Sequence, residues 1–255
     1  MFDNLTIDTD ERIAVVTMDR PPVNAIDQSM YGQIADLFGH ADVHLPDVDV
    51  VILTSQGRHF CGGNDLTEFM TMNPDNVAGR MAVVHAAFWA IYQCAVPVIA
   101  AVDGVAAGTG LAIAGSCDLV VASDRARFGL PEISVGAMGG AKHLSRLVPQ
   151  GVVRRMFYTA DLVDARELAA FGGIAAITTP EDLVTTARQV GRSIARHSPV
   201  AIRIAKRSLN AIEYMDLHDG YAKEQQFTGE LSRFGDAKEA VAAFFDKREP
   251  RYTGS

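Results

Sequence analysis

The N-terminal residues alternate between β-branched and polar side chains in two short stretches. Residues 5–9 (LTIDT) and 13–18 (IAVVTM) flank a polar turn and predict a β-hairpin, which Arg20-Pro21-Pro22 ends. The next pattern is helical, because apolar residues recur every three or four positions from residue 28 to residue 40. Asp27 stands just before this stretch, where a carboxylate can cap the first turn of a helix.

Short apolar runs then alternate with helical stretches along the middle of the chain. Residues 48–55 (VDVVILTS), 98–102 (VIAAV) and 118–122 (DLVVA) are too short for helices and apolar enough to be buried on both faces. Between them, residues 77–93 and 108–115 have the length and spacing of helices. A strand, a helix and a strand in this order imply parallel pairing with right-handed crossovers.

The last quarter of the chain has a different pattern. From residue 180 to residue 247, apolar residues keep an almost continuous helical spacing. We therefore expect an α/β core at residues 1–190 and a helical region at residues 191–255. The length of 255 residues suits one large domain, or one domain with an appendage.

Charge and composition exclude several classes of protein. The formal net charge is −8, whereas a general nucleic-acid binder needs a basic excess to neutralise phosphates. The longest central stretch free of charge and proline, residues 104–117, is shorter than the roughly 20 residues that a membrane-spanning helix needs. The acidic N-terminus lacks the pattern of a secretory signal, which predicts a cytoplasmic protein. Three cysteines without metal-ligand spacing are expected to be core residues.

Glycine clusters invite a nucleotide-binding interpretation, and two motifs can be tested letter by letter. A dinucleotide fingerprint starting at Gly108 would need a third glycine where the chain has Ile113. A phosphate-binding loop before Lys142 would need glycine before it and serine or threonine after it, but those positions hold Ala141 and His143. Both nucleotide-binding motifs therefore fail.

Two other glycine-bearing segments lie where a strand-like run gives way to a turn. They are residues 59–66 (HFCGGNDL) and 103–119 (DGVAAGTGLAIAGSCDL). Glycine permits close approach of another backbone, and a helix that begins after such a turn presents free N–H groups. Two such turns at one end of a sheet can direct two backbone donors at a single oxygen. Ordinary tight packing of a helix on a strand is the alternative.

Four segments in this order resemble the crotonase superfamily, the enoyl-CoA hydratase and isomerase fold, over essentially the whole chain. They are RPPVNAI at 20–26, GRHFCGGNDL at 57–66, the stretch from PVIAAVDG to LPEISVG at 97–136, and GYAKEQQFTGEL with AVAAFFDKREPRY near the end. The resemblance implies an α/β spiral of repeated ββα units, with C-terminal helices that build homotrimers or homohexamers. It also implies that the backbone N–H groups of Asn64 and Thr109 hold the thioester carbonyl as an oxyanion hole.

The resemblance assigns acid–base chemistry to one carboxylate. Glu132, in the segment FGLPE, matches the second catalytic glutamate of the family. The first glutamate position holds Ala112, which cannot transfer a proton. This departure argues against standard two-glutamate hydration and favours chemistry that one carboxylate can perform.

Further contacts with the substrate follow from the same match. The matched residues are Val23, Ala25, Gly63, Asn64, Asp65, Leu66, Thr67 and Thr109. Near the C-terminus, Phe244 and Lys247 match positions that reach the CoA of a neighbouring subunit. CoA is part of the substrate, so no separate cofactor is implied. No metal site is expected, because the histidines are scattered without a ligand spacing.

The chain is therefore predicted to be an acyl-CoA enzyme of the enoyl-CoA hydratase/isomerase type, as in fatty acid metabolism. Its partners would be an acyl-CoA thioester and other copies of itself, with no nucleic acid and no membrane insertion. Within enzymes, the alternatives are a single-glutamate isomerase, a hydratase-lyase or a decarboxylase. A non-catalytic CoA-thioester-binding scaffold stays open because of Ala112.

Overall fold

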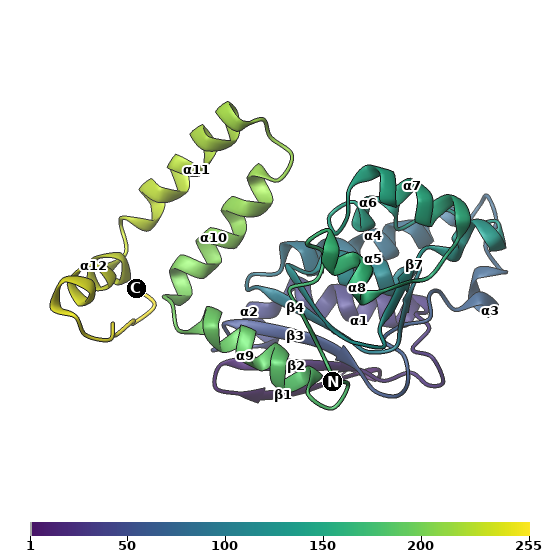
Figure 1. The fold of residues 1–255 in the computed structure, drawn as a ribbon, viewed down its shortest axis with the longest axis horizontal. Helices are drawn as coiled ribbons and strands as arrows, with labels where there is room; N and C mark the ends of the chain where they lie inside the picture. The colour runs from purple at the N-terminus through teal and green to yellow at the C-terminus, as the bar shows by residue number, and fades with distance from the viewer. Residues whose placement is uncertain (1) are drawn as a thin grey trace.

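The protein has an α/β body from which a helical arm extends (Figure 1). The structure is a computed structural model that describes residues 2–255. The body holds a six-stranded sheet in the order β1-β2-β3-β4-β6-β9 and a three-stranded sheet in the order β5-β7-β8. The strands are β1 Leu5–Asp10, β2 Ile13–Met18, β3 Val50–Ser55, β4 Val98–Val102, β5 Val105–Ala107, β6 Leu119–Ser123, β7 Arg127–Gly129, β8 Val163–Asp164 and β9 Ala176–Thr178.

Helices cover the sheets and are the only regular elements after β9. They are α1 Gln28–Gly39, α2 Ala41–His44, α3 Leu66–Phe69, α4 Val77–Gln93, α5 Thr109–Ser116, the 3₁₀ helix η1 Pro131–Val135, α6 Ala141–Leu144, α7 Gln150–Thr159, α8 Ala165–Ala170, α9 Leu183–Ala195, α10 Pro199–Ile212, α11 Leu217–Leu231 and α12 Gly235–Asp246. None of the helices within residues 2–255 has the length and apolar character that crossing a bilayer requires.

The central strands β3 and β4 of the large sheet are buried on both faces, as their apolar runs predict, whereas most of the edge strand β1 is exposed. β1 and β2 form an antiparallel hairpin with Leu5 opposite Met18, and the pairs from β2 through β3, β4 and β6 to β9 are parallel. Successive residues of a strand point to opposite faces. Val16 accordingly packs in the cluster that includes α1 and α4, whereas Val15 packs with Ala187 of α9. The predicted hairpin, parallel strands and intervening helices are confirmed.

Helix α1 begins where the sequence predicts. The side chain of Asp27 accepts a hydrogen bond from the Met30 N–H at 2.8 Å and so caps the helix. The apolar face of α1 is buried against α4, and Tyr31 is buried on the same helix with only 1% of its surface exposed. A phenol in such a core position needs a hydrogen-bond partner.

Helix α5 is buried along its whole length because its side chains are small. All eight residues from Thr109 to Ser116 are buried. A Cβ atom on Gly110 would clash with the carbonyl oxygen of Cys61, so only glycine allows the helix to pack this closely on the preceding turn. The three cysteines are buried and free, as expected.

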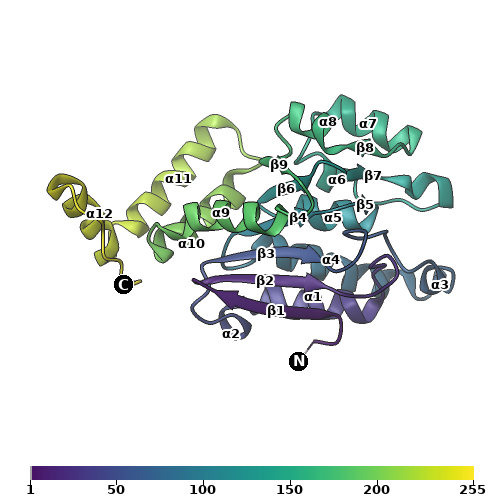
Figure 2. The same cartoon turned by 60° about the horizontal axis from the view of Figure 1, so that its bottom comes forward.

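The arm, helices α10 to α12, projects from the body, whereas α9 lies along the large sheet (Figures 1 and 2). The predicted boundary at residue 190 falls inside α9, so the division into 1–190 and 191–255 stays a prediction. Lys206 of α10 is buried and ties the arm to the body. Its Nζ donates to Asp118 Oδ2 at 2.8 Å and to the Val96 carbonyl at 3.0 Å.

Candidate active site

The two glycine-bearing turns line one cavity of about 650 Å³. Its walls are the segments 20–25 and 62–66, the start of α5, and residues 131–137. Of the predicted site residues, it is lined by Val23, Ala25, Gly63, Asn64, Asp65, Leu66, Thr109 and Glu132. Thr67, Phe244 and Lys247 do not line it; the last two belong to the end of the arm.

The first turn is held by backbone hydrogen bonds on both sides of Asn64. Ile26 donates its N–H to the Gly63 carbonyl at 2.9 Å, and Asp65 donates its N–H to the Ile26 carbonyl at 2.9 Å. Among residues 2–255, no acceptor pairs with the N–H of Asn64 itself. This donor is therefore fixed in position and unused by the fold.

The second turn places Thr109 at the first position of α5. Gly108, just before it, has φ 55° and ψ −113°, a backbone conformation that only glycine adopts readily. The Thr109 N–H likewise has no acceptor within the described residues, as the first N–H groups of a helix lack intrahelical partners. An isolated bridge between Cys61 and Ala106 joins the two turns.

Asp65 fixes the turn and does not have the environment of a base. Its Oδ1 accepts from the Thr67 and Glu68 N–H groups at 2.9 and 3.2 Å, which caps α3. Arg20 lies 2.7 Å from its Oδ2. This hydrogen bond lowers the pKa of Asp65, so the carboxylate is paired and committed to the turn.

Glu132 lies in a different environment, on η1 against the start of α5. Its Oε1 would be 2.9 Å from a Cβ atom on Gly108, so the missing side chain makes room for the carboxyl group. Its Oε2 is buried and has no partner among the described residues. Burial raises the pKa of Glu132 above its ordinary value. Of the two carboxyl groups that line the cavity, this one is free to transfer protons.

Ala112 is buried on α5 and does not line the cavity. It stands three residues after Thr109, and its N–H donates to the Gly108 carbonyl at 3.0 Å in the first turn of the helix. Since alanine offers no ionisable group, this position adds no second acid or base to the site.

Tyr31 is a neighbour of the site that the sequence pattern does not single out. Its hydroxyl lies 2.6 Å from Asn64 Oδ1 and 2.7 Å from Thr109 Oγ1. The available signal was a tyrosine on the apolar face of an amphipathic helix, which needs a buried polar partner. This pattern does not identify the hydrogen-bond partners of the Tyr31 hydroxyl.

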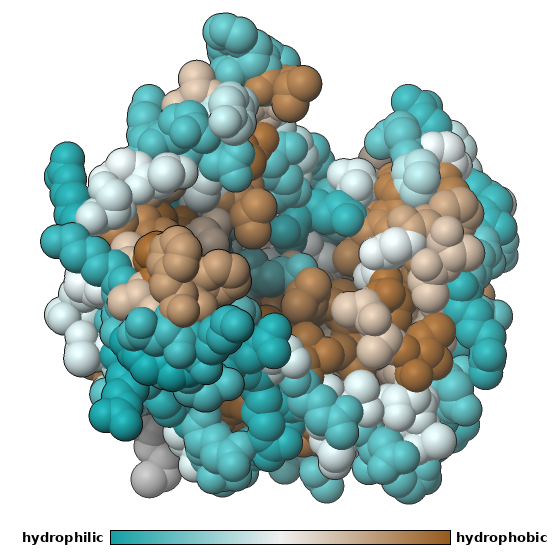
Figure 3. Space-filling model, turned by 60° about the vertical axis from the view of Figure 1, so that its left-hand side comes forward, coloured by the Kyte–Doolittle hydropathy of each residue, from teal (hydrophilic) through white to brown (hydrophobic). Residues whose placement is uncertain are grey.

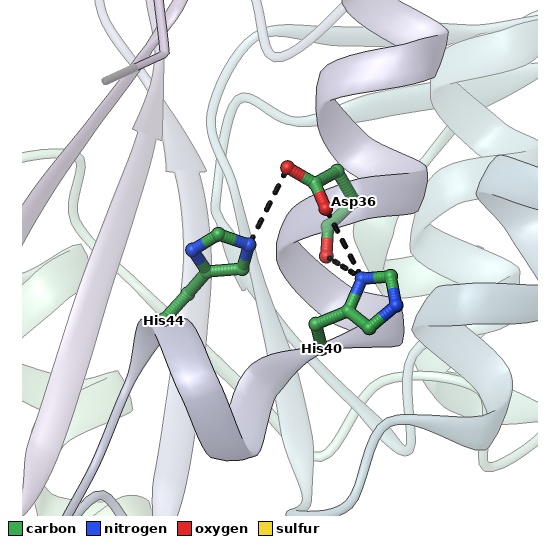
Figure 4. A group of neighbouring side chains, drawn as sticks. All are labelled: Asp36, His40 and His44. Atoms are coloured by element: carbon green, nitrogen blue, oxygen red, sulfur yellow. Dashed lines mark hydrogen bonds and ion pairs between the residues drawn. The ribbon is translucent and has the colours of Figure 1, made fainter.

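A second group of polar side chains lies at the other end of α1 (Figure 4). Asp36, His40 and His44 present ligand atoms within 4.8 Å of one another, although no metal site is expected from the sequence. Asp36 Oδ1 lies 3.1 Å from His40 Nδ1, and its Oδ2 lies 3.4 Å from His44 Nε2, so the two imidazoles share one carboxylate. Gln28, at the start of this helix, contacts Glu68 beside the cavity. A helix of 12 residues is about 18 Å long, so the cluster is remote from Glu132.

Comparison with known proteins agrees with this fold. The sequence model described as Enoyl-CoA hydratase/isomerase matches residues 8–255. The chain belongs to the enoyl-CoA hydratase/isomerase family, within the crotonase superfamily. An enoyl-CoA hydratase structure from Bacillus anthracis has a TM-score of 0.93 at 27% identity, covering 99% of this chain and 100% of that one. The predicted fold class is confirmed.

Two curated relatives differ in their named activities. A (7aS)-7a-methyl-1,5-dioxo-2,3,5,6,7,7a-hexahydro-1H-indene-carboxyl-CoA hydrolase from Rhodococcus jostii is 41% identical over 254 residues, covering 97% of this chain and 96% of that protein. A short-chain-enoyl-CoA hydratase from Clostridium acetobutylicum is 33% identical over 255 residues, covering 97% of each. This chain is thus similar to enzymes that act on CoA compounds by more than one reaction.

The unpaired Glu132 carboxylate gives a prediction about stability. A carboxyl group whose pKa is raised on folding holds its proton more tightly in the folded protein, so stability falls as pH rises above the ordinary value of 4.5. We expect Glu132→Gln to melt at pH 7 at a temperature at least as high as wild type, with the difference shrinking as the pH is lowered to 4.5. Calorimetry against the exposed variant Glu181→Gln is the measurement. A lower melting temperature for Glu132→Gln at pH 7 would contradict this.

Proposed function

We propose that the protein transforms acyl-CoA thioesters through an enolate, with Asn64 and Thr109 as the oxyanion hole and Glu132 as the acid–base residue. One observation supports this above the others. The cavity that holds a free, buried carboxylate oxygen of Glu132 is also lined by two residues whose backbone N–H groups are unused by the fold. A binding protein has no need for an ionisable group placed this way.

The proposed reaction develops negative charge on the carbonyl oxygen of the thioester. Glu132 removes a proton from the carbon next to the thioester, and the electron pair passes to the carbonyl oxygen. The N–H groups of Asn64 and Thr109 donate to that oxygen, and each such donor is worth about 3 kcal/mol. Helix α5 begins at Thr109 and adds its positive end, roughly half an elementary charge. The raised pKa of Glu132 makes it a stronger base than an ordinary carboxylate.

The absence of a glutamate at Ala112 selects among reactions. Hydration with two carboxylates divides the base and acid roles between them. With Glu132 alone, the same group removes one proton and returns it at another carbon, as in double-bond isomerisation, or takes part in hydratase-lyase chemistry or decarboxylation. We therefore favour single-glutamate isomerisation over two-glutamate hydration as the reaction of this protein.

A second candidate is hydrolysis of an oxo-substituted cyclic acyl-CoA, and the 41% identical relative favours it. For a ring ketone β to the thioester, water adds to the ketone carbon and the bond between that carbon and the α-carbon breaks. The electron pair passes to the thioester as an enolate, which the oxyanion hole stabilises. Glu132 takes a proton from the attacking water and returns it to the α-carbon, so that a carboxylic acid and a saturated α-carbon result. The product is one water heavier, and CoA stays attached.

Assembly is part of the proposal, because the arm exposes many apolar side chains. The exposed apolar residues from α10 onwards include Leu209, Tyr214, Met215, Leu217, Tyr221, Val241, Phe244 and Phe245. Figure 3 shows apolar residues in patches on either side of a hollow on the face seen from the arm's side. Contiguous apolar surface of this kind marks a protein interface. We propose a homotrimer, alone or paired into a hexamer, in which Phe244 and Lys247 reach the CoA of a neighbouring copy.

Proton exchange tests the enolate without knowledge of the natural substrate. In D₂O, the wild-type enzyme is expected to exchange the α-protons of butyryl-CoA. Glu132→Gln should lose at least about 100-fold in this rate, and Glu181→Gln should not. Because the pKa of Glu132 is raised, the acid limb of the wild-type pH profile should have its midpoint above 4.5. Nuclear magnetic resonance gives the rates, and unchanged exchange in Glu132→Gln would remove this residue from the mechanism.

A pair of substrates separates the two candidate reactions. If the protein is a carbon–carbon hydrolase, 2-oxocyclohexane-1-carboxyl-CoA should become an open-chain thioester heavier by one water, with no free thiol. Mass spectrometry follows the product and a thiol reagent follows CoA. Release of CoA would instead indicate thioester hydrolysis. Turnover of a 3-enoyl-CoA to its 2-enoyl isomer, with the ring compound untouched, would leave isomerisation as the function.

Measuring the oligomeric state tests the proposal that the arm forms the trimer. Light scattering should give a mass of three or six chains. Deletion after residue 195 should give insoluble or monomeric protein with weakened CoA binding. Lys247→Ala should raise the KM for butyryl-CoA with little change in the exchange rate at saturation, because the residue is remote from Glu132 in its own chain. An active monomer at micromolar concentration would contradict the trimer and the role of Lys247 together.

A further inference from the structure

Tyr31 lies where the two turns of the cavity meet. It projects from the beginning of α1, is 1% exposed, and packs edge-on against the ring of Phe88 in α4 at 6.0 Å. Its hydroxyl lies between Asn64 Oδ1 and Thr109 Oγ1, at 2.6 and 2.7 Å. Thr109 is itself 4% exposed. The hydroxyl is thus held on one side by the core and on the other by the two residues whose N–H groups are unused.

The three groups can be paired in only one order. A tyrosine hydroxyl has one proton, and the oxygen of an asparagine amide can only accept. Tyr31 therefore donates to Asn64, and it accepts from Thr109, whose hydroxyl proton has no other partner among the described residues. The result is a directed chain from Thr109 through Tyr31 to Asn64. Removing the central hydroxyl would leave two polar groups unpaired.

The backbone hydrogen bonds that join the two turns do not involve the donor residues Asn64 and Thr109 themselves. Cys61 donates its N–H to Val105 and accepts at its carbonyl from Ala107, both at 3.0 Å. This bridge joins Cys61 to Ala106, and each of these lies three residues before its donor, Asn64 or Thr109. The Tyr31 hydroxyl supplies a connection at the donor residues themselves.

We infer that Tyr31 is a positioning residue that sets the spacing of the two backbone donors of the oxyanion hole. It touches no substrate atom, since its side chain is buried behind the cavity wall. The inference rests on the proposed enolate function. Donor geometry matters steeply, because a displacement of about 1 Å can cost on the order of 100-fold in rate. We expect loss of the hydroxyl to lower kcat about tenfold and to leave the KM for the CoA thioester within about twofold.

The experiment compares Tyr31→Phe with a matched loss of another tyrosine hydroxyl. Tyr92 donates to Glu213 Oε2 at 2.8 Å and lies 3.1 Å from the Asn210 carbonyl, and it does not line the candidate active site. The probe is butyryl-CoA carrying ¹³C at the thioester carbonyl. Two readouts are taken for each protein: α-proton exchange in D₂O, and the infrared carbonyl stretch of the bound probe, which falls as the oxyanion hole polarises the carbonyl.

The expected result is specific to Tyr31. Wild type and Tyr92→Phe should both lower the carbonyl frequency of the bound probe, whereas Tyr31→Phe should return it toward the value in solution and lose about tenfold in exchange. Thr109→Val keeps the backbone N–H and deletes one link of the chain, so it should shift the band in the same direction. If Tyr31→Phe does not fold, Thr109→Val alone tests the inference.

Two results would overturn the inference. A full wild-type frequency shift in Tyr31→Phe and Thr109→Val, or equal losses in Tyr92→Phe, would show that Tyr31 does not position the donors while leaving the oxyanion hole intact. A wild-type enzyme that leaves the carbonyl frequency at its solution value would refute the oxyanion hole and the role of Tyr31 with it.

Discussion

The candidate active site depends on the close contact between helix α5 and the turn that contains Cys61. A helix can approach a backbone this closely only where it lacks side chains, and Gly110 provides that gap beside the Cys61 carbonyl. The bridge between Cys61 and Ala106 then aligns the two turns, and the room at Gly108 admits the Glu132 carboxyl group. Asn64, Thr109 and Glu132 line one cavity because of this contact.

The same packing controls the electrostatics of the cavity. Excluding water raises the pKa of Glu132 and leaves its Oε2 without a partner, which costs stability in the folded protein. Thr109 is buried and Asn64 is partly buried, and dipoles act more strongly on a developing charge where the dielectric is low. Asp65 shows the contrast, because Arg20 and two N–H groups stabilise its charge and fit it for structure rather than proton transfer.

The sequence predicts the parts of this protein that follow from local pattern. Buried parallel strands, the cap at Asp27 and the two glycine-bearing turns are visible in the order of residues, and the structure confirms them. The role of Tyr31 could not be predicted. A tyrosine on the apolar face of a helix gives the same sequence pattern whether its hydroxyl bonds to a backbone carbonyl or to residues of the active site. The contacts of Asp36 with His40 and His44 depend on the break between α1 and α2, which periodicity locates only approximately. Phe244 and Lys247 lie outside the cavity of their own chain, so a single sequence cannot place them against a ligand.

The main-chain origin of the two donors has a genetic consequence. No codon change at Asn64 or Thr109 removes a backbone N–H, except one that introduces proline. Glu132, in contrast, loses its proton-transfer group with almost any substitution. Under the proposed function, a single substitution at Glu132 could therefore abolish the reaction, whereas most substitutions at Asn64 and Thr109 would keep the donors that bind the thioester. Non-catalytic acyl-CoA carriers would arise readily from such a chain.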